Sequence, residues 1–249
     1  LVANNKQTSI DNFAIELPET SLKMDTIHLV YDSLQAFEHF AEEVHFSFRT
    51  LPSQITLKDI SPFVPVLSHF KEPITLDMEV KGTVDQLNCS HLEIVSEEQQ
   101  FRLRGDVSLQ DLSHPQDAYV YGTLSELSAN TRGVGFLVRN LNPDYNGVPP
   151  ILERLGNISF RGEISGYFTD LVTYGQLRTS LGDVKTDLKL SADKSKGLFA
   201  YSGAVKTTDF KLGELLANEQ LGEITFNLDV HGRHITNQRP TVELKGLIA

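Results

Sequence analysis

The sequence has one cysteine and no tryptophan among its 249 residues. A lone Cys89 cannot form an internal disulfide, and it excludes zinc and iron–sulfur sites that need several cysteine ligands. The absence of tryptophan counts against a sugar-binding platform built on large aromatic rings. No apolar run approaches the roughly 18–20 residues that a bilayer-spanning helix needs. With 40% hydrophobic and 22% charged residues, the composition is that of a folded chain.

Positive charge is also in short supply. Lysine and arginine number 22 against 33 aspartate and glutamate residues, which gives a net charge of −11. This balance works against nucleic acid and anionic membrane surfaces, because both need a basic patch to neutralise phosphate. We therefore expect no nucleic-acid partner, whereas a neutral apolar ligand or a protein partner remains open. Because the chain opens at Leu1 and stops in mid-pattern at Ala249, we expect it to be a piece of a longer protein.

A nine-residue pattern occurs three times, at 74–82, 158–166 and 224–232. Each copy reads Ile, Ser or Thr, a bulky apolar residue, two variable residues, an acid, a β-branched residue, a variable residue and Gly. Apolar residues alternate with polar ones, which is typical of a strand with one buried and one wet face. Such strands favour an antiparallel sheet. The apolar stripe consists of Ile74, Leu76, Met78, Val80, Ile158, Phe160, Ile164, Ile224, Phe226, Leu228 and Val230.

Each copy follows a segment with helical signals, at 61–70, 149–156 and 209–218. Proline begins the second segment and Gly156 is suited to end it, while Asp209 stands at the cap position of the third. Further alternating stretches, at 101–109, 184–190, 198–205 and 242–248, predict additional strands. The unit is therefore a short helix, a turn and a long amphipathic strand.

The segment before the first copy has a different pattern. Apolar residues at helical spacing predict a helix from 33 to 43, and the turn-rich residues 142–147 are the best candidate for a linker. The predicted organisation is a β-rich unit at 1–141, with the first repeat at 61–110, and a second at 142–249 with two further repeats. One continuous domain is the alternative.

No catalytic or cofactor-binding motif stands out. Ser191-Ala192-Asp193-Lys194 fits a nucleophile motif without its supporting partners, and Gly133-Val134-Gly135 lacks the third glycine of a dinucleotide loop. We therefore expect no enzyme, no cofactor and no metal site.

The apolar stripe then has two interpretations. In the first it is a sealed core under a second layer. In the second it lines a curved sheet whose apolar face is a partly open trough, with short helices as end caps.

The segments 209–216 and 221–232, with further copies at 63–87 and 164–171, resemble the repeats of the AsmA/TamB family, and within it the TamB-like (translocation and assembly module) relatives. The resemblance covers about residues 55–249. It implies a mainly β fold, in which a long curved antiparallel or mixed sheet forms a taco-like trough with a few short helices. It also implies an interior periplasmic fragment of a long protein anchored in the inner membrane by a segment absent here.

The resemblance further implies a role in moving phospholipid toward the outer membrane. The apolar stripe named above would then line a groove for phospholipid acyl chains. A barrel of the Omp85 type is the implied protein partner, through parts of the parent chain not evident in these residues. The alternatives are a scaffold or chaperone-like module for outer-membrane proteins, offering sheet edges to unfolded strands, and an enzyme or carbohydrate-binding sandwich with a closed core.

Overall fold

The computed structural model describes residues 1–17, 19–61, 65–114, 116–141, 148–193, 198–235 and 241–248. The strands are β1 (Val2–Ala3), β2 (Gln7–Glu16), β3 (Ser21–Val30), β4 (His45–Arg49), β5 (Ser53–Thr56), β6 (Pro73–Gly82), β7 (Gln86–Ser96), β8 (Phe101–Gln110), β9 (Tyr119–Ala129), β10 (Ile158–Tyr167), β11 (Asp170–Thr179), β12 (Gly182–Asp193), β13 (Leu198–Lys211), β14 (Glu223–Ile235) and β15 (Thr241–Ile248). The helices are η1 (Leu34–His39), α1 (Phe40–Glu43), η2 (Leu57–Ile60), η3 (Pro65–His69), η4 (Glu97–Gln99), α2 (Thr131–Leu141), α3 (Pro150–Arg154) and α4 (Leu212–Leu216).

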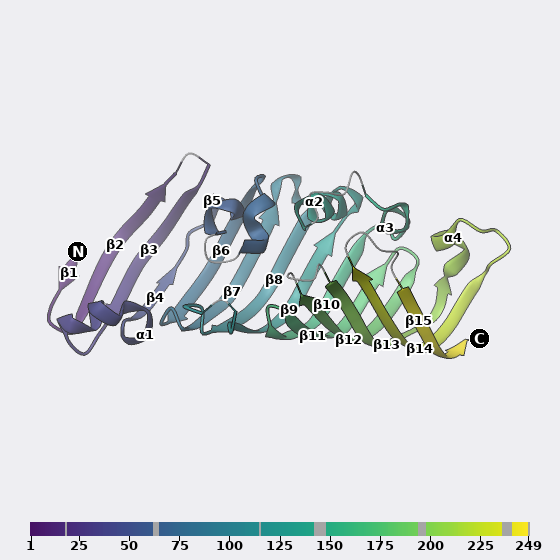
Figure 1. Cartoon of the computed structure of the whole chain (residues 1–249). Coiled ribbons are helices and arrows are strands. Elements are labelled where there is room, and N and C mark those ends of the chain that lie inside the picture. The colour runs from purple at the N-terminus through teal and green to yellow at the C-terminus, as the bar shows by residue number, and fades with distance from the viewer. Residues whose placement is uncertain are drawn as a thin grey trace.

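All the described strands belong to one sheet, and every pair of neighbours is antiparallel. Their order in space follows their order in the chain, so the sheet grows by one strand at a time from the N-terminus to the C-terminus (Figure 1). The predicted mainly β fold with a long sheet and a few short helices is confirmed. Parallel pairs, which the sequence left open, do not occur among the described strands.

One position in the sheet is filled by two short strands. β4 and β5 both lie between β3 and β6, with β4 against residues 79–82 of β6 and β5 against residues 73–76. Buried hydroxyl groups replace the missing ladder bonds where the chain steps from one to the other. The backbone N–H of Met78 donates to Thr50 Oγ1 at 2.8 Å, and that of Lys23 donates to Ser53 Oγ at 2.9 Å. The break in the strand therefore leaves these backbone groups satisfied.

All three copies of the repeat are strands, β6, β10 and β14, and each follows a short helix as predicted. The predicted strands at 101–109, 184–190, 198–205 and 242–248 are confirmed as β8, β12, β13 and β15. Residues 34–43 are helical, as a 3-10 turn followed by one α-helical turn. Within the first predicted helix, residues 62–64 lie outside the described residues, and the remainder forms η3.

The prediction that Asp209 caps the third helix is wrong. β13 runs through Asp209 to Lys211, and the register with β14 shifts between Thr207 and Phe210. Asp209 has a φ of 52°, as the extra residue of a β-bulge can. The bulge keeps the strand paired beyond the expected cap, so α4 begins only at Leu212.

β9 and β10 lie on either side of the proposed boundary between two units, and they are hydrogen-bonded neighbours. The intervening residues leave the sheet as α2 and α3 and then return to it. The sheet is therefore continuous across this position. The predicted linker at 142–147 lies outside the described residues.

The helices η2, η3, α2, α3 and α4 lie along one long edge of the sheet, which we call the helical edge, and tight reversals form the opposite hairpin edge (Figure 1). Two hydrophobic clusters lie at the helical edge. The first joins α2 and η3 to strands β5, β6, β8 and β9, around Phe70, Ile74 and Phe136. The second joins α3 and α4 to β11–β14, around Leu181 and Phe210. The closed core of the described residues is thus mainly a strip along one edge, with a smaller third cluster of Tyr31, Ala36 and Val44 around η1.

Candidate functional site

The strand registers place apolar residues of successive strands in rows that cross the sheet. The central row consists of Phe48, Val80, Cys89, Val107, Gly122, Ile164, Thr173, Leu188, Gly203, Val230 and Leu244. The hairpin-side row consists of Phe46, Gly82, Leu87, Leu109, Val120, Gly166, Leu171, Leu190, Tyr201, Gly232 and Val242. The helix-side row consists of Leu76, Ile94, Leu103, Leu127, Phe160, Leu177, Val184, Thr207, Phe226 and Ile248.

These three rows form one face of the sheet, which we call the apolar face. None of its residues carries a formal charge at pH 7. At the helical side of this face, Thr207 Oγ1 donates to the carbonyl of Asp183 at 2.6 Å, so its hydroxyl is bonded to the sheet itself. The central row crosses ten strand-to-strand gaps, which at about 4.8 Å each corresponds to roughly 48 Å. The face is therefore a continuous apolar path along the long axis of the sheet.

Burial divides this face into a closed part and an open part. Val80 and Cys89, in the central row, are 2% and 7% exposed. From Ile164 on β10 to Val230 on β14 the non-glycine members of the central row are only partly buried. None of these belongs to the buried clusters of the described residues, which lie at the helical edge and around η1. The C-terminal half of the sheet therefore presents apolar side chains that are partly exposed, although Leu228 and Val184 on the same face are 8% and 9% exposed.

Every glycine within a strand lies on the apolar face. Beyond the glycines of the three rows, these are Gly105, Gly162, Gly175, Gly182 and Gly246. At Gly162, an added Cβ would overlap the carbonyl oxygen of Tyr174 and approach Phe160 Cζ at 2.8 Å. Glycine thus permits a close approach of neighbouring strands on this side, as expected where a sheet bends toward that side. The apolar face is the concave one.

The structure separates the residues of the predicted groove. Ile74 and Leu76 are 1% and 6% exposed and lie in the first cluster, with Met78 and Ile158 packed against it. Ile224 packs against the second cluster, and Leu228 is 8% exposed. Ile164 and Val230 lie in the central row, and Phe160 and Phe226 lie in the helix-side row; all four are partly exposed.

Several residues of the apolar face were missed by the sequence analysis. They belong mainly to β7, β9, β11, β12 and β13, and they include the partly exposed Val120, Leu171, Leu188, Leu190 and Tyr201. Leu188 and Leu190 belong to a stretch whose alternation did predict a strand. No local signal assigned their side chains to the same face as the three repeats, because that assignment depends on the strand register.

The opposite face of the sheet is polar. Arg104 on β8 pairs with Glu93 on β7 at 2.7 Å and with Glu126 on β9 at 3.6 Å. Lys189 on β12 pairs with Asp170 on β11 at 2.9 Å, and a hydrogen bond from Ser191 together with Lys189 lowers the pKa of Asp170. Such pairs lie across neighbouring strands and keep this face hydrated. This face is polar only in part, because it also carries Tyr121, Tyr167 and Tyr174, which are 46%, 50% and 65% exposed.

On the apolar face, burial raises the pKa of the Cys89 thiol to about 11, with a smaller contribution from Asp106. The thiol is therefore protonated at neutral pH, and Cys89 acts as a small apolar side chain.

At the hairpin edge, the hydrogen bond and charge of Asp111 raise the pKa of His114, whose Nδ1 lies 2.8 Å from Asp111 Oδ1.

In comparisons with known proteins, the chain matches no family model, no curated protein and no solved structure. Within the described ranges, no helix has the length and apolar character needed to cross a membrane. The functional argument therefore rests on the apolar face.

Proposed function

We propose that the apolar face binds the acyl chains of phospholipid and conducts them along the sheet. The observation that carries this proposal is the uncharged central row, which crosses eleven strands and is partly exposed over the C-terminal half. Contiguous exposed apolar surface of this extent is a binding surface rather than ordinary protein exterior. The proposal assigns no chemical step to any residue, and no cofactor.

The energetics suit a conduit. Moving an acyl chain through water costs about 0.8 kcal/mol per methylene, so about ten methylenes face roughly 8 kcal/mol. A continuous apolar path removes most of this barrier, and because successive positions along the row are chemically alike, a bound chain meets no deep minimum. The face offers no fixed charge for the head group.

The cellular setting belongs to the same proposal. It places the chain in the periplasm, as part of a longer protein anchored in the inner membrane, with lipid moving toward the outer membrane. This part rests on the resemblance of the segments 209–216 and 221–232 to the AsmA/TamB family. A barrel partner of the Omp85 type would contact other parts of the parent protein.

A second candidate function is a scaffold for outer-membrane protein assembly. β15 is the observation that favours it, because all eight of its residues are exposed and its outer edge has no partner among the described strands. Val242 and Leu244 are 54% and 57% exposed. An unpaired edge of this kind can add an extended segment as a further strand.

The deciding experiment is extraction and mass spectrometry of the chain, purified without detergent, for co-purifying phospholipid. Val230→Asp places a charge on the apolar face of β14, and Asn227→Asp adds the same charge to the polar face of the same strand. We expect lipid at a reproducible ratio in the wild type and in Asn227→Asp, and its loss in Val230→Asp. A stable wild-type protein without lipid would contradict the conduit, and the scaffold would then be the better proposal.

A further inference from the structure

The helical turns η1 and α1 interrupt the hairpin edge, where they lie between β3 and β4 (Figure 1). Val30 and His45 pair at the ends of these antiparallel strands, and two residues can join such a pair. The chain instead uses the fourteen residues from Tyr31 to Val44. These pack around the buried Tyr31, Ala36 and Val44, and the Tyr31 hydroxyl donates to the carbonyl of Asn4 at 2.9 Å. The connection is therefore an ordered excursion from the sheet, and binding residues concentrate in connections of this kind.

The outer side of this excursion carries an exposed apolar row, Leu34, Phe37 and Phe40, which we call the apolar ridge. Side chains three residues apart stand above one another in a 3-10 helix, so these side chains line up. They are 62%, 41% and 40% exposed, and the rings of Phe37 and Phe40 are 6.1 Å apart. A contiguous row of large apolar side chains that faces solvent marks a contact surface.

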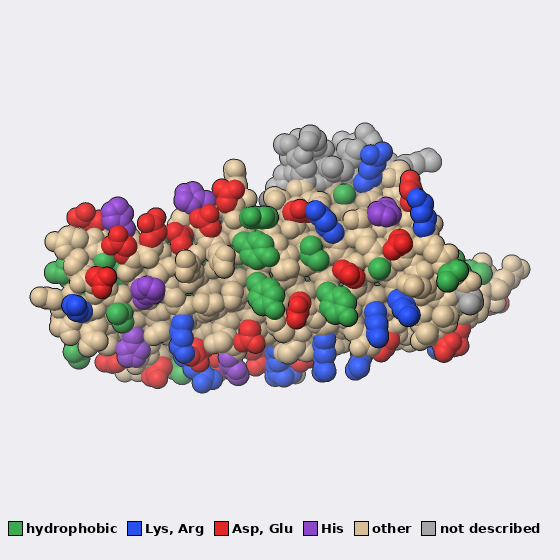
Figure 2. All heavy atoms as spheres, turned by 90° about the horizontal axis from the view of Figure 1, so that it is seen from below, with side chains coloured by type: hydrophobic (Ala, Val, Ile, Leu, Met, Phe, Trp, Pro, Cys, Tyr) green, Lys and Arg blue, Asp and Glu red, His purple; other side chains and the backbone are tan. Residues whose placement is uncertain are grey.

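The residues beside the apolar ridge are acidic. The segment 32–43 contains no lysine or arginine, and its acidic residues are Asp32, Glu38, Glu42 and Glu43. All four are exposed, and in the described part of the chain none of them has an ion-pair partner. Asp85 adds a further carboxylate, because its backbone N–H donates to the carbonyl of Ala41 at 3.1 Å. Figure 2, which views the molecule from this edge, shows acidic and histidine side chains gathered toward the N-terminal end.

Two lysines in neighbouring elements do not balance these carboxylates. Lys6 lies close to the excursion, since its carbonyl accepts the N–H of Tyr31 at 2.9 Å. Lys81 on β6 is already paired with Glu79 on the same strand. The apolar ridge is therefore bordered by an excess of negative charge.

From these observations we infer that the apolar ridge is a docking surface for another protein, through a segment whose apolar side chains are flanked by arginine or lysine. The apolar side chains of that segment would cover Leu34 and Phe40, and its cations would pair with carboxylates such as Glu38. An arginine can also stack on an exposed phenylalanine ring. The inference stands apart from the proposed lipid binding, because no residue of the ridge belongs to the three rows of the apolar face.

Charge favours this partner over a membrane surface or a second copy of the chain. Anionic lipids would repel the carboxylates beside the ridge, and insertion of the ridge into any bilayer would take those carboxylates out of water. A second copy has the same net charge of −11 and the same acidic segment. A two-fold contact between ridges would therefore place like charges opposite each other.

Fluorescence anisotropy of a labelled synthetic peptide, titrated with the whole chain, tests the inference. The peptide is an amphipathic helix with leucine on one side and arginine on the other, and a second peptide has glutamate in place of every arginine. The ridge variant combines Leu34→Gln with Phe40→Gln. Phe37 is kept, because its ring packs against the buried Tyr31 with 4.8 Å between the centroids. Leu216→Gln is the matched control, since Leu216 ends the short helix α4 and is 48% exposed.

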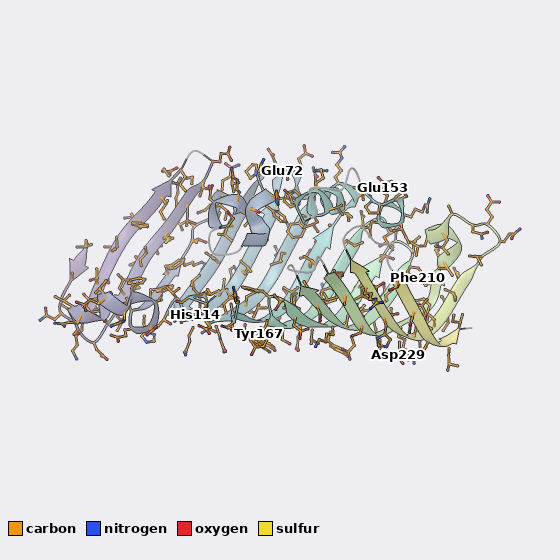
Figure 3. The ribbon with its side chains drawn as sticks, in the orientation of Figure 1. Glu72, His114, Glu153, Tyr167, Phe210 and Asp229 are labelled. Carbon is orange, nitrogen blue, oxygen red and sulfur yellow. The ribbon has the colours of Figure 1, made fainter. Side chains whose placement is uncertain are left out.

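A second pair of variants tests the charges. Glu38→Gln, Glu42→Gln and Glu43→Gln together remove three charges beside the ridge. The control makes the same change of net charge near the opposite, helical edge, which Glu153 marks in Figure 3, through Glu153→Gln, Glu219→Gln and Glu223→Gln. Far-UV circular dichroism and urea unfolding establish that each variant is folded.

We expect the arginine peptide to bind the wild type and Leu216→Gln equally, and the ridge variant at least about tenfold more weakly. We expect the charge variant at the ridge to weaken binding several-fold and its helical-edge control to have a smaller effect. Unchanged binding in the ridge variant, or equal binding of the glutamate peptide, would overturn the inference. Binding of phosphatidylcholine vesicles, or self-association in sedimentation velocity, that is lost in the ridge variant would assign the ridge to a membrane or to a second copy instead.

Discussion

Gly122 offers a way to block the apolar face without adding charge, at a buried position where Ile164 would have to give way. It lies in the central row between Val107 and Ile164, and its backbone is not in the left-handed region. An added Cβ would lie 3.2 Å from Ile164 Cγ2 and 3.5 Å from Val107 Cγ2, so Ile164 needs to move by only a few tenths of an ångström. In Gly122→Phe, a phenyl ring would therefore stand on the floor of the trough.

The expected effects on transport and on stability are measured separately. If the ring forces about two methylenes of a passing chain into water, the barrier rises by roughly 1.6 kcal/mol and transfer slows about 15-fold. Propensity alone would make the replacement stabilising by up to about 1 kcal/mol, but a ring at the buried Gly122 overpacks its neighbours, so we expect the free energy of unfolding to fall by about 1–3 kcal/mol. The measurements are the rate of lipid transfer between donor and acceptor vesicles and urea unfolding.

Two variants control this experiment. Thr123→Phe adds the same ring to the polar face of β9, and we expect it to leave transfer unchanged. Gly162→Phe adds the ring where its Cβ overlaps a backbone carbonyl oxygen, and we expect it to destabilise the sheet by about 1–3 kcal/mol. If folded Gly122→Phe transfers lipid at the wild-type rate, the central row is not the path of the acyl chains.

Three further predictions concern the closed layer and two of the groups whose pKa is shifted, Cys89 and His114. Phe136→Ala should lower the free energy of unfolding by about 3–5 kcal/mol, since it empties the contact with Phe70 and Phe101; a loss under about 1 kcal/mol in urea unfolding would mean that α2 is only loosely docked. The Cys89 thiol should react with a thiol reagent at pH 8 far more slowly than a cysteine introduced at the exposed Thr169 in the variant Thr169→Cys, and equal rates would contradict its burial. The pKa of His114 is raised, so its pairing with Asp111 stabilises the fold fully below the ordinary value of 6.5, and this contribution is lost as the pH rises through the raised pKa. In an NMR titration, the pKa of His114 should fall in the variant Asp111→Asn. An unchanged pKa would refute the pairing.

The sequence predicted strands where alternation was clean and missed them where it was not. β6, β8, β10 and β14 have apolar residues facing one side and polar residues facing the other. In β11, Val172 and Tyr174 lie on the polar face, whereas Thr173 and Gly175 lie on the apolar face, so the expected pattern is inverted. In β7, the bulge at His91 shifts the alternation halfway along the strand. These irregularities are settled by neighbouring strands rather than by local sequence.

The candidate site was less predictable than the strands. The apolar stripe of the repeats was read correctly as one face of each strand, but its division into a closed edge and an open floor depends on where the helices lie. Val80 and Val230 occupy the same position in their repeats, yet Val80 is 2% exposed and Val230 is partly exposed. Equal local sequence signals therefore do not give equal burial.

The order of strands in the sheet has a consequence for folding. Because most strands pair with their neighbours in the chain, structure can spread from one strand to the next. The helical excursions interrupt this uniformity. One cluster links β5–β9 through α2, the other links β11–β14 through α3 and α4, and β2 contributes to neither. Denaturation should accordingly proceed in blocks, with the N-terminal hairpin losing amide protection first and the strands beneath α2 last.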